Sequence, residues 1–169
     1  IDNGHKAIPI SVNVSRIDMF TLDVVKCFKD LVNKYQINHN LIEIEITESS
    51  YASDYEIISK VVDDFRLAGF TVLMDDFGSG FSSLTILKQF TFDIITIDLA
   101  FLEHFDKNNK AEKILKSVIQ IAKRLNMEVI AEGVETKRQE DFLVELGCNR
   151  AQGYRFAKPA SASKIAKKE

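Results

Sequence analysis

The sequence has few of the residues that build soft-metal centres or disulfide frameworks. Its 169 residues include only two cysteines and three histidines. Cys27 and Cys148 lie far apart, with no Cys-x-x-Cys pattern and no histidine at ligand spacing, so we expect two reduced thiols packed as small hydrophobic residues. The histidines are isolated from one another along the chain. A histidine or cysteine metal site is therefore not expected.

Long apolar runs and clustered basic residues are also missing. No segment has the length and hydropathy of a membrane span and no secretory signal opens the chain, so we expect a cytoplasmic chain whose parent protein could be membrane-anchored elsewhere. The net charge is −3. The lack of a basic stripe with aromatic platforms argues against binding to a DNA or RNA polymer. Hydrophobic residues make up 46% and charged residues 28%, as in an ordinary globular domain.

Helical patterns alternate with short β-like runs along the whole chain. The spacing of apolar residues predicts helices over 22–35, 55–68, 111–125 and 138–146. Ser53 and Asp54 are predicted to cap the second of these helices, and Gly69 suits its end. Gly147 ends the last helix. This alternation with short connections predicts an α/β fold with a parallel sheet and helical covers.

Six strands are predicted, and each ends in, or carries near its end, a carboxylate or carboxamide. Their sequences are SVNVS, IEIEITE, TVLMDD, IITID, EVIAEG and RAQGY. The polar residues, in chain order, are Asn13, Glu45 with Glu48, Asp75 with Asp76, Asp98, Glu132 with Glu135, and Gln152. In parallel α/β folds the loops after the carboxyl ends of the strands form the site, so we expect these side chains to converge.

A closed (β/α)₈ barrel has eight strands and usually more than about 200 residues. Six strands therefore leave two alternatives, an open sheet or a TIM-type barrel whose N-terminal part is missing. Period-two alternation places Glu43, Glu45 and Thr47 opposite the isoleucines of the same strand. A carboxylate-bearing face of this kind must line water, cations or hydrogen-bond donors.

The most specific segment is DDFGSGFSSL, residues 75–84. Its adjacent aspartates point in different directions from a strand end and can contact two cations, while Gly78 and Gly80 permit a tight loop. The plain alternative is a flexible turn after a capping aspartate. A dinucleotide-binding fingerprint needs glycine where Ser83 stands, and the Walker lysine is absent, so this loop is not expected to cradle phosphate alone.

The other paired carboxylates are weak signals when taken singly. Glu45 and Glu48 could form part of a capping box, and one member of the pair Glu132 and Glu135 could simply be a carboxylate at a helix N-terminus. Together, at least five oxygen donors at successive strand ends suit Mg²⁺ or Mn²⁺ better than zinc. Two such ions about 4 Å apart would clamp the attacking and leaving oxygens of a phosphodiester.

Six ordered segments resemble the EAL-domain family of cyclic-di-GMP phosphodiesterases: SVNVSR, IEIEITES, DDFGSGFSSL, FDIITID, VIAEGVET and AQGYRFAKP. The resemblance implies a TIM-type (β/α) barrel with one antiparallel strand that hydrolyses cyclic di-GMP to pGpG with Mg²⁺ or Mn²⁺, while Ca²⁺ supports binding without turnover. It makes residues 1–169 the C-terminal two thirds of one EAL domain, about six of eight βα units. Further signalling domains in the parent chain and a homodimer through the loop after DDFG and its adjoining helix are also expected.

The resemblance also implies roles for the metal-binding residues. Asn13, Glu45 and Asp75 match ligands of a first metal ion. Asp75, Asp76 and Glu132 match the side of the second ion. Glu132 is in addition the position of the general base in the family.

Other positions of the resemblance concern the loop and the nucleotide. Glu48 matches the carboxylate that anchors the DDFG loop, in which Gly78 and Gly80 lie. Asp98, Glu135 and Gln152 match polar positions around the nucleotide and its water.

Two departures from the family pattern concern activity. The Glu-Ala-Leu segment, with a metal-binding glutamate and a nearby phosphate-binding arginine, does not occur in this sequence. Where the family has Lys-x-Asp, this chain has Thr96, Ile97 and Asp98. A threonine hydroxyl can hydrogen-bond a water but carries no charge to stabilise hydroxide. Losing such a group costs about 10²- to 10⁴-fold in rate.

Three functional hypotheses follow. The first is a degenerate EAL domain that binds cyclic di-GMP as a regulatory module, with weak or no turnover, and that is inactive as the present fragment. The second is an active phosphodiesterase in the full-length parent. The third is a protein-interaction scaffold that binds no nucleotide.

Overall fold

Six strands form a single parallel sheet in the order in which they occur along the chain. The computed structural model describes residues 7–52, 54–78, 83–97, 109–148 and 150–161. The strands are β1 (Ile10–Asn13), β2 (Ile42–Thr47), β3 (Thr71–Phe77), β4 (Ile94–Ile97), β5 (Glu128–Ala131) and β6 (Arg150–Ala151). Neighbours in this order pair in parallel. The predicted six-stranded parallel sheet is therefore confirmed.

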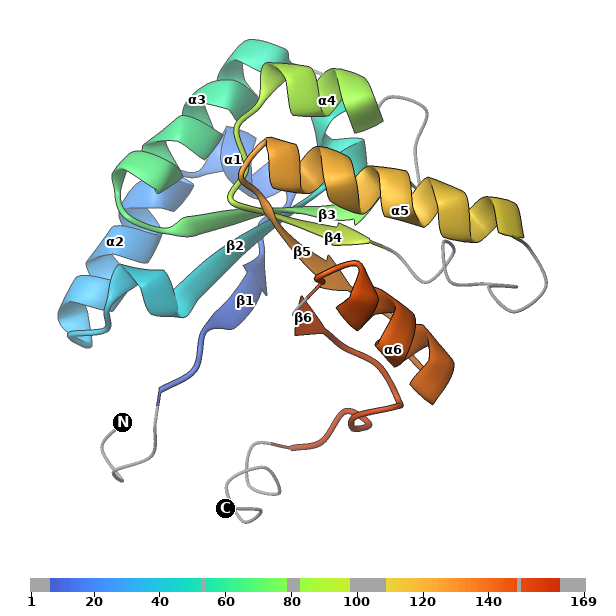
Figure 1. The fold of residues 1–169 in the computed structure, drawn as a ribbon. Helices are drawn as coiled ribbons and strands as arrows, with labels where there is room; N and C mark the ends of the chain where they lie inside the picture. The colour runs from blue at the N-terminus through green and yellow to red at the C-terminus, as the bar shows by residue number, and fades with distance from the viewer. Residues whose placement is uncertain (1–6, 53, 79–82, 98–108, 149, 162–169) are drawn as a thin grey trace.

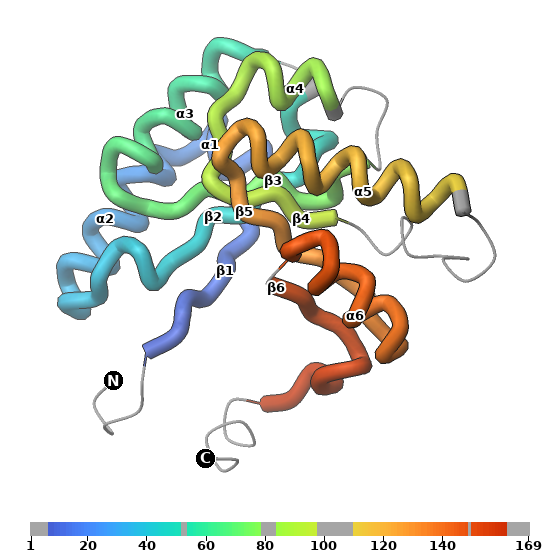
Figure 2. Tube along the Cα trace, in the orientation of Figure 1, coloured from blue at the N-terminus to red at the C-terminus, as the bar shows by residue number. Residues whose placement is uncertain are grey.

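Helices connect successive strands and lie on one side of the sheet (Figures 1 and 2). They are α1 (Arg16–Thr21), α2 (Val24–Lys34), α3 (Tyr55–Leu67), α4 (Ser83–Gln89), α5 (Asn109–Arg124) and α6 (Lys137–Glu145), with short 3₁₀ turns η1 (His39–Leu41) and η2 (Glu48–Ala52). The four predicted helices are found within about two residues of their expected ends. The short helices α1 and α4 were not predicted. No described helix is both long and apolar enough to cross a bilayer.

The main core lies between the sheet and its helices. Ile44, Met74 and Ile95 point to this side from neighbouring strands and are fully buried. Phe65 of α3 meets them, and its ring packs edge-on against Phe28 of α2 with centroids 5.5 Å apart. On the opposite side of the sheet Leu73, Ile94 and Ile130 form a separate small apolar cluster. The sheet therefore has two buried faces, as in a barrel.

An ion pair shows how strongly the sheet is curved. Arg150 Nη2 of β6 donates to Glu43 Oε2 of β2 at 2.9 Å, although four strand-to-strand steps separate these strands. In a flat sheet four steps span about 19 Å, which is beyond the reach of an arginine side chain. The sheet therefore curls into a half-barrel with both residues on its inner face. Of the two alternatives left open by the sequence, the incomplete barrel is confirmed.

The same ion pair shows the stagger of the strands. In the register of the sheet Glu45 is level with Leu73, Ile94 and Glu128, whereas Arg150 is level with Ile130. Relative to Glu45, Arg150 is therefore displaced by two residues toward the carboxyl ends of the strands. Relative to Glu43 the displacement is four residues. An advance of about one residue per strand is the stagger of an eight-stranded barrel with a shear of eight.

Two local predictions are wrong. Asp54 precedes α3 but adopts a left-handed backbone with φ of 54° and makes no capping bond with its side chain, because a capping residue needs extended backbone to reach the first turn. Ser53 lies outside the described residues. Cys27 is exposed, because it lies on the outer side of α2, and only Cys148 is buried as expected. Both cysteines are free thiols.

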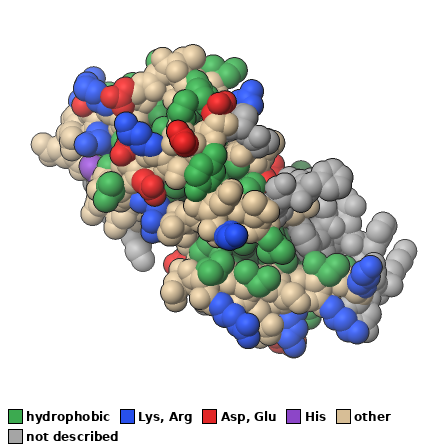
Figure 3. All heavy atoms as spheres, turned by 90° about the horizontal axis from the view of Figure 1, so that it is seen from above, with side chains coloured by type: hydrophobic (Ala, Val, Ile, Leu, Met, Phe, Trp, Pro, Cys, Tyr) green, Lys and Arg blue, Asp and Glu red, His purple; other side chains and the backbone are tan. Residues whose placement is uncertain are grey.

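The prediction that glycines end two of the helices is confirmed. Gly69 after α3 has a φ of 87° and Gly147 after α6 has a φ of 70°. These left-handed conformations favour glycine at the end of a helix. Seen from above, acidic and basic side chains are mixed over the upper-left part of the described surface, whereas mainly Lys and Arg side chains appear over the lower-right part (Figure 3).

The core predicts a sharp contrast between two residues of α3. Phe65→Ala removes a fully buried ring and should lower the free energy of unfolding by about 3–5 kcal/mol. Leu67→Ala, two residues later, removes a side chain that is 86% exposed and should change it by no more than about 0.5 kcal/mol. Urea unfolding followed by circular dichroism measures both. Equal losses for the two variants would contradict this account of the core.

Candidate functional site

Oxygen-bearing side chains occupy the inner face of the half-barrel at the carboxyl ends of its strands. Asn13 pairs with Glu45 across β1 and β2, and Thr47 pairs with Asp75 across β2 and β3. Glu132 and Gln152 directly follow β5 and β6. We call these five residues the rim: Asn13, Glu45, Asp75, Glu132 and Gln152. Their sequence-based grouping rests on their places at the strand ends. The register puts Asn13, Glu45 and Asp75 on one face, and a hydrogen bond joins Gln152 to Glu132.

The two aspartates of the DDFG segment lie at an irregularity in β3. The register with β4 shifts between Met74 and Phe77, so β3 carries one extra residue here. Asp76 adopts φ of 59°, a left-handed conformation that is uncommon outside glycine. A bulge of this kind redirects a side chain at the end of a strand. It allows Asp75 and Asp76 to point in different directions.

Thr96 holds the carboxylate of Asp75. Its hydroxyl donates to Asp75 Oδ1 at 2.5 Å and accepts from the backbone N–H of Asp76 at 3.1 Å. The same N–H also lies 2.9 Å from Asp75 Oδ1. Thr96 is only 1% exposed. The residue at the position of the family lysine therefore contacts a predicted metal ligand directly.

Glu45 is partly buried and lies among other carboxylates. Burial raises the pKa of Glu45 above its usual value, and the negative charges of Asp75 and Glu43 add to the rise, while a hydrogen bond from the Ser11 side chain partly opposes it. The ionised form of Glu45 is thus less favourable than that of an exposed glutamate, and a nearby cation would stabilise it. This electrostatic situation favours binding of a positive charge at the rim.

A second pair of rim residues joins the ends of β5 and β6. The Gln152 side-chain amide donates to Glu132 Oε1 at 2.5 Å. The backbone is fixed at the same place, because Gln152 N–H donates to the carbonyl of Ala131 and Val134 N–H to that of Gln152. Gly153 packs so closely on Val134 that a Cβ atom would lie 2.2 Å from its carbonyl oxygen. Only glycine fits after Gln152.

Glu48 contacts the DDFG loop. The N–H of Gly78 donates to Glu48 Oε2 at 2.9 Å, and Glu48 is 4% exposed. Gly78 itself has a φ of 94°. The anchoring role of Glu48 stays a prediction, and this contact is consistent with it.

Three further predicted residues are not brought into the described rim. Asp98 and Gly80 lie outside the described residues. Glu135 is exposed, and its backbone N–H donates to Gln139 Oε1 at the start of α6. Its place beside the nucleotide stays a prediction.

The chemistry of the rim fits a hard divalent cation. Across the described ranges, no three His, Cys, Asp or Glu side chains are gathered closely enough to hold an ion among themselves. Mg²⁺, however, is usually held by one or two carboxylates, with waters and substrate phosphates completing its shell. Asp75 lies close enough to Glu45 for its negative charge to raise the pKa of Glu45, and the amide of Asn13 is next to Glu45 in the register. These three side chains could hold such an ion.

The sequence analysis did not predict that Arg150 supports the site. It lies on the inner face of β6, two residues before Gln152, and pairs with the buried Glu43. In the sequence, Arg150 is marked only by its charge and by its place two residues before Gln152, on the same face of the strand. Neither feature indicates a partner 107 residues away.

The fold and the rim define an incomplete (β/α) barrel with an acidic mouth. The sequence model of the EAL domain matches residues 1–159, and the chain belongs to this family. The cyclic di-GMP phosphodiesterase PdeR of Escherichia coli is 33% identical over 153 residues, which cover 90% of this chain and 23% of PdeR. The chain spans about a fifth of the length of the curated relatives it matches.

Solved structures show the same fold. The EAL domain of Mycobacterium smegmatis DcpA superposes with a TM-score of 0.89 at 31% identity, covering 95% of this chain and 72% of that one. Klebsiella pneumoniae BlrP1 gives a TM-score of 0.84 at 27% identity and covers 90% of this chain and 39% of its own. BlrP1 was solved with cyclic di-GMP and manganese, and also with cyclic di-GMP and calcium.

The raised pKa of Glu45 predicts a pH-dependent effect of its removal. The folded protein holds the Glu45 proton more tightly than the unfolded chain, so this group lowers stability as pH rises through its folded pKa. In the metal-free protein Glu45→Gln should therefore raise the melting temperature at pH 7. The gain should shrink as pH falls, because Glu45 then becomes protonated.

The matched control is Glu135→Gln, which alters an exposed carboxylate and should leave the melting temperature unchanged at each pH. Adding Mn²⁺ should reverse the order, since the wild-type protein binds the ion more tightly and gains more stability. Thermal scans at several pH values give both results. A Glu45→Gln protein that is less stable at pH 7 without metal would contradict this electrostatic account.

Proposed function

We propose that the chain is the cyclic-di-GMP-binding part of an EAL-type signalling protein, with weak or no hydrolysis to pGpG. Membership of the EAL family and the relatives named as cyclic di-GMP phosphodiesterases support the ligand. The rim of oxygen donors supports use of a divalent cation, Mg²⁺ or Mn²⁺. The bound Mn²⁺ and Ca²⁺ of the BlrP1 structures support the same class of ion.

The position of Thr96 is the observation that supports low activity. Its hydroxyl is buried and is engaged with Asp75 and with the backbone of Asp76. A lysine ammonium at this position would place a positive charge beside the attacking water, and the threonine places none there. The chain keeps Asn13, Glu45 and Asp75 as proposed ligands of an ion and lacks the lysine that would stabilise hydroxide.

Each described rim residue has a proposed task in this function. Asn13, Glu45 and Asp75 would hold one ion, while Asp75, Asp76 and Glu132 would hold the second. A bound Mg²⁺ or Mn²⁺ would lower the pKa of a water and offset the charge of the phosphodiester. Glu132 would accept the proton of this water, and Gln152 would keep the Glu132 carboxylate oriented through their hydrogen bond.

An active phosphodiesterase in the full-length protein is the second candidate. Glu45, Asp75 and Glu132, the carboxylates of the family site described here, are all retained on the rim. Their retention favours this candidate over a scaffold that binds no nucleotide. Calorimetry and a turnover assay separate the three possibilities.

We also propose that the chain works within a longer, cytoplasmic signalling protein. Its small share of the relatives' length supports further domains. A homodimer through the loop after DDFG and its adjoining helix stays a prediction. A groove beside this region is lined largely by apolar side chains, among them Leu84, Ile114 and Val118, which supports an interface there.

Binding is tested by calorimetry of the full-length protein with cyclic di-GMP and Ca²⁺, an ion expected to allow binding without turnover. We expect saturable heat with a dissociation constant in the micromolar range or below. Asp75→Asn should weaken binding at least about tenfold, since it removes a charged ligand of the ion. Lys26→Met, which changes an exposed residue of α2, is the control and should bind as the wild type does. No heat at high micromolar ligand would favour the scaffold.

Turnover is tested by following pGpG formation with Mn²⁺ in the wild type and in Thr96→Lys. We expect the lysine variant to be about 10²-fold faster or more, because it supplies the missing charge beside the water. Thr96→Ser keeps the hydroxyl without adding charge and should stay as slow as the wild type. Equal rates for wild type and Thr96→Lys would contradict the degenerate site and favour the active enzyme.

A further inference from the structure

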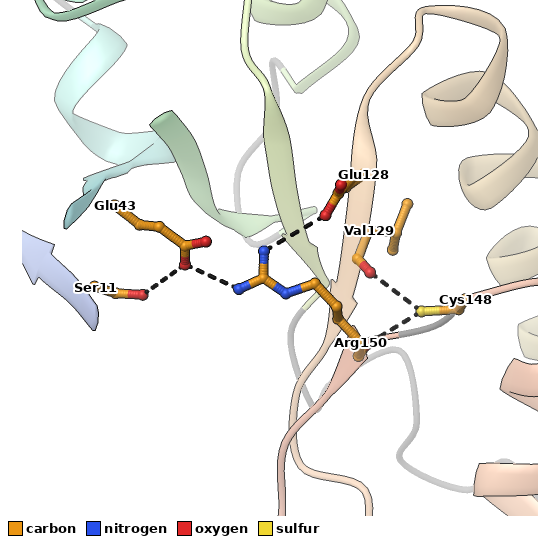
Figure 4. Close-up of polar contacts among 6 residues, drawn as sticks. All are labelled: Ser11, Glu43, Glu128, Val129, Cys148 and Arg150. Carbon is orange, nitrogen blue, oxygen red and sulfur yellow. Dashed lines mark hydrogen bonds and ion pairs between the residues drawn. The ribbon is translucent and has the colours of Figure 1, made fainter. Parts of the chain in front are cut away.

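A charged carboxylate lies inside the half-barrel where the proposed function does not use it. Glu43 on β2 is only 4% exposed, and a buried charge is unfavourable unless it is paired and hydrogen-bonded. Its Oε2 accepts from Arg150 Nη2 at 2.9 Å and from the hydroxyl of Ser11 at 3.3 Å (Figure 4). Arg150 in addition reaches Glu128 Oε2 at 3.5 Å. We call the Arg150–Glu43 pair the clamp.

The clamp differs from the other polar contacts of the inner face in the distance it spans. Thr96 and Asp75 belong to the neighbouring strands β4 and β3, and Gln152 and Glu132 follow the neighbouring strands β6 and β5. Among the described residues, the clamp is the hydrogen-bonded side-chain pair that crosses the interior from β2 to β6. It therefore fixes the separation of two strands that share no backbone ladder.

The clamp lies directly beneath the rim. Glu43 precedes Glu45 by two residues on the same face of β2, and Arg150 precedes Gln152 by two residues on the same side of β6. Two residues along a strand correspond to about 6.6 Å. Gln152 in turn is hydrogen-bonded to Glu132. The clamp thus connects the side of the rim that carries Glu45 with the side that carries Glu132.

Stability alone gives little reason for such a pair. A buried ion pair can often be replaced by apolar side chains of similar volume with no loss of stability. The inner face already contains apolar packing from Leu73, Ile94 and Ile130. What apolar side chains would not reproduce is a directional bond of fixed length across the interior.

We propose that Arg150 and Glu43 are positioning residues that hold the two sides of the cation-binding rim at the separation needed for metal binding. This inference rests on the proposed function, because it presupposes that the rim binds a divalent ion. Neither residue touches the ion. They act through the strands that carry Glu45, Gln152 and Glu132.

The test is Mn²⁺ affinity of the full-length protein, measured from the free-ion signal in electron paramagnetic resonance. Arg150→Met removes a positive charge near the rim, so electrostatics alone predicts tighter Mn²⁺ binding, whereas loss of the clamp predicts binding about tenfold weaker. The double variant E43M/R150M removes one charge of each sign and leaves no unpaired buried carboxylate. It should fold with nearly unchanged stability and also bind Mn²⁺ about tenfold more weakly.

Glu128→Gln is the matched control, since it removes the exposed partner of the same arginine at 3.5 Å and should leave the affinity unchanged. If Arg150→Met does not fold, the double variant alone decides. Wild-type affinity in E43M/R150M would overturn the clamp while leaving the cation-binding rim intact. Absence of Mn²⁺ binding in the wild-type protein would overturn the proposed function and the clamp together.

Discussion

Parallel pairing of staggered strands is the constraint on which the whole site depends. Because all the described strands run in one direction, their carboxyl ends meet at one edge of the sheet. Alternation along each strand then places aliphatic side chains against the helices and polar ones inside. Asn13, Glu45 and Asp75 share the inner face for this reason, although they come from three separate parts of the sequence. A slip of one residue in any strand would move its rim residue to the helical core.

Buried carboxylates on the inner face lower the stability of the fold, and hydrogen-bond partners offset part of this loss. Glu43 is paired with Arg150, and one oxygen of Asp75 is held by Thr96. Glu45 has no such compensation from a basic side chain, and burial raises its pKa. A partly buried carboxylate that a hydroxyl, but no basic side chain, stabilises favours an ion that arrives from solution. Strain at binding sites is commonly balanced by packing elsewhere, here the aromatic and aliphatic core around Phe65.

Much of the fold follows from the sequence because its patterns are long and regular. The apolar periodicity of α2, α3 and α5 extends over three or more turns, and each predicted strand is bounded by turn residues. Helices α1 and α4 were missed because six or seven residues are too few for a periodic signal. The capping role given to Asp54 failed because the left-handed backbone of one residue cannot be inferred from its type.

The site was only partly predictable for a related reason. Alternation placed Glu45 and Thr96 on the inner face, but it did not show that the Thr96 hydroxyl binds Asp75. The bulge in β3 and the pair formed by Arg150 and Glu43 depend on tertiary geometry, namely the register shift and the closure of the sheet. Residues 107 positions apart have no local pattern that connects them. Contacts of this kind can be identified only from the three-dimensional structure.

The central claim is that side chains from separate strands converge on a common divalent ion. The most direct measurement is anomalous diffraction at the manganese edge from crystals of the protein grown with Mn²⁺ and cyclic di-GMP. The account predicts a peak on the inner face within about 2.3 Å of carboxylate oxygens of both Glu45 and Asp75. A manganese peak bound elsewhere, or coordination by neither of these carboxylates, would contradict it.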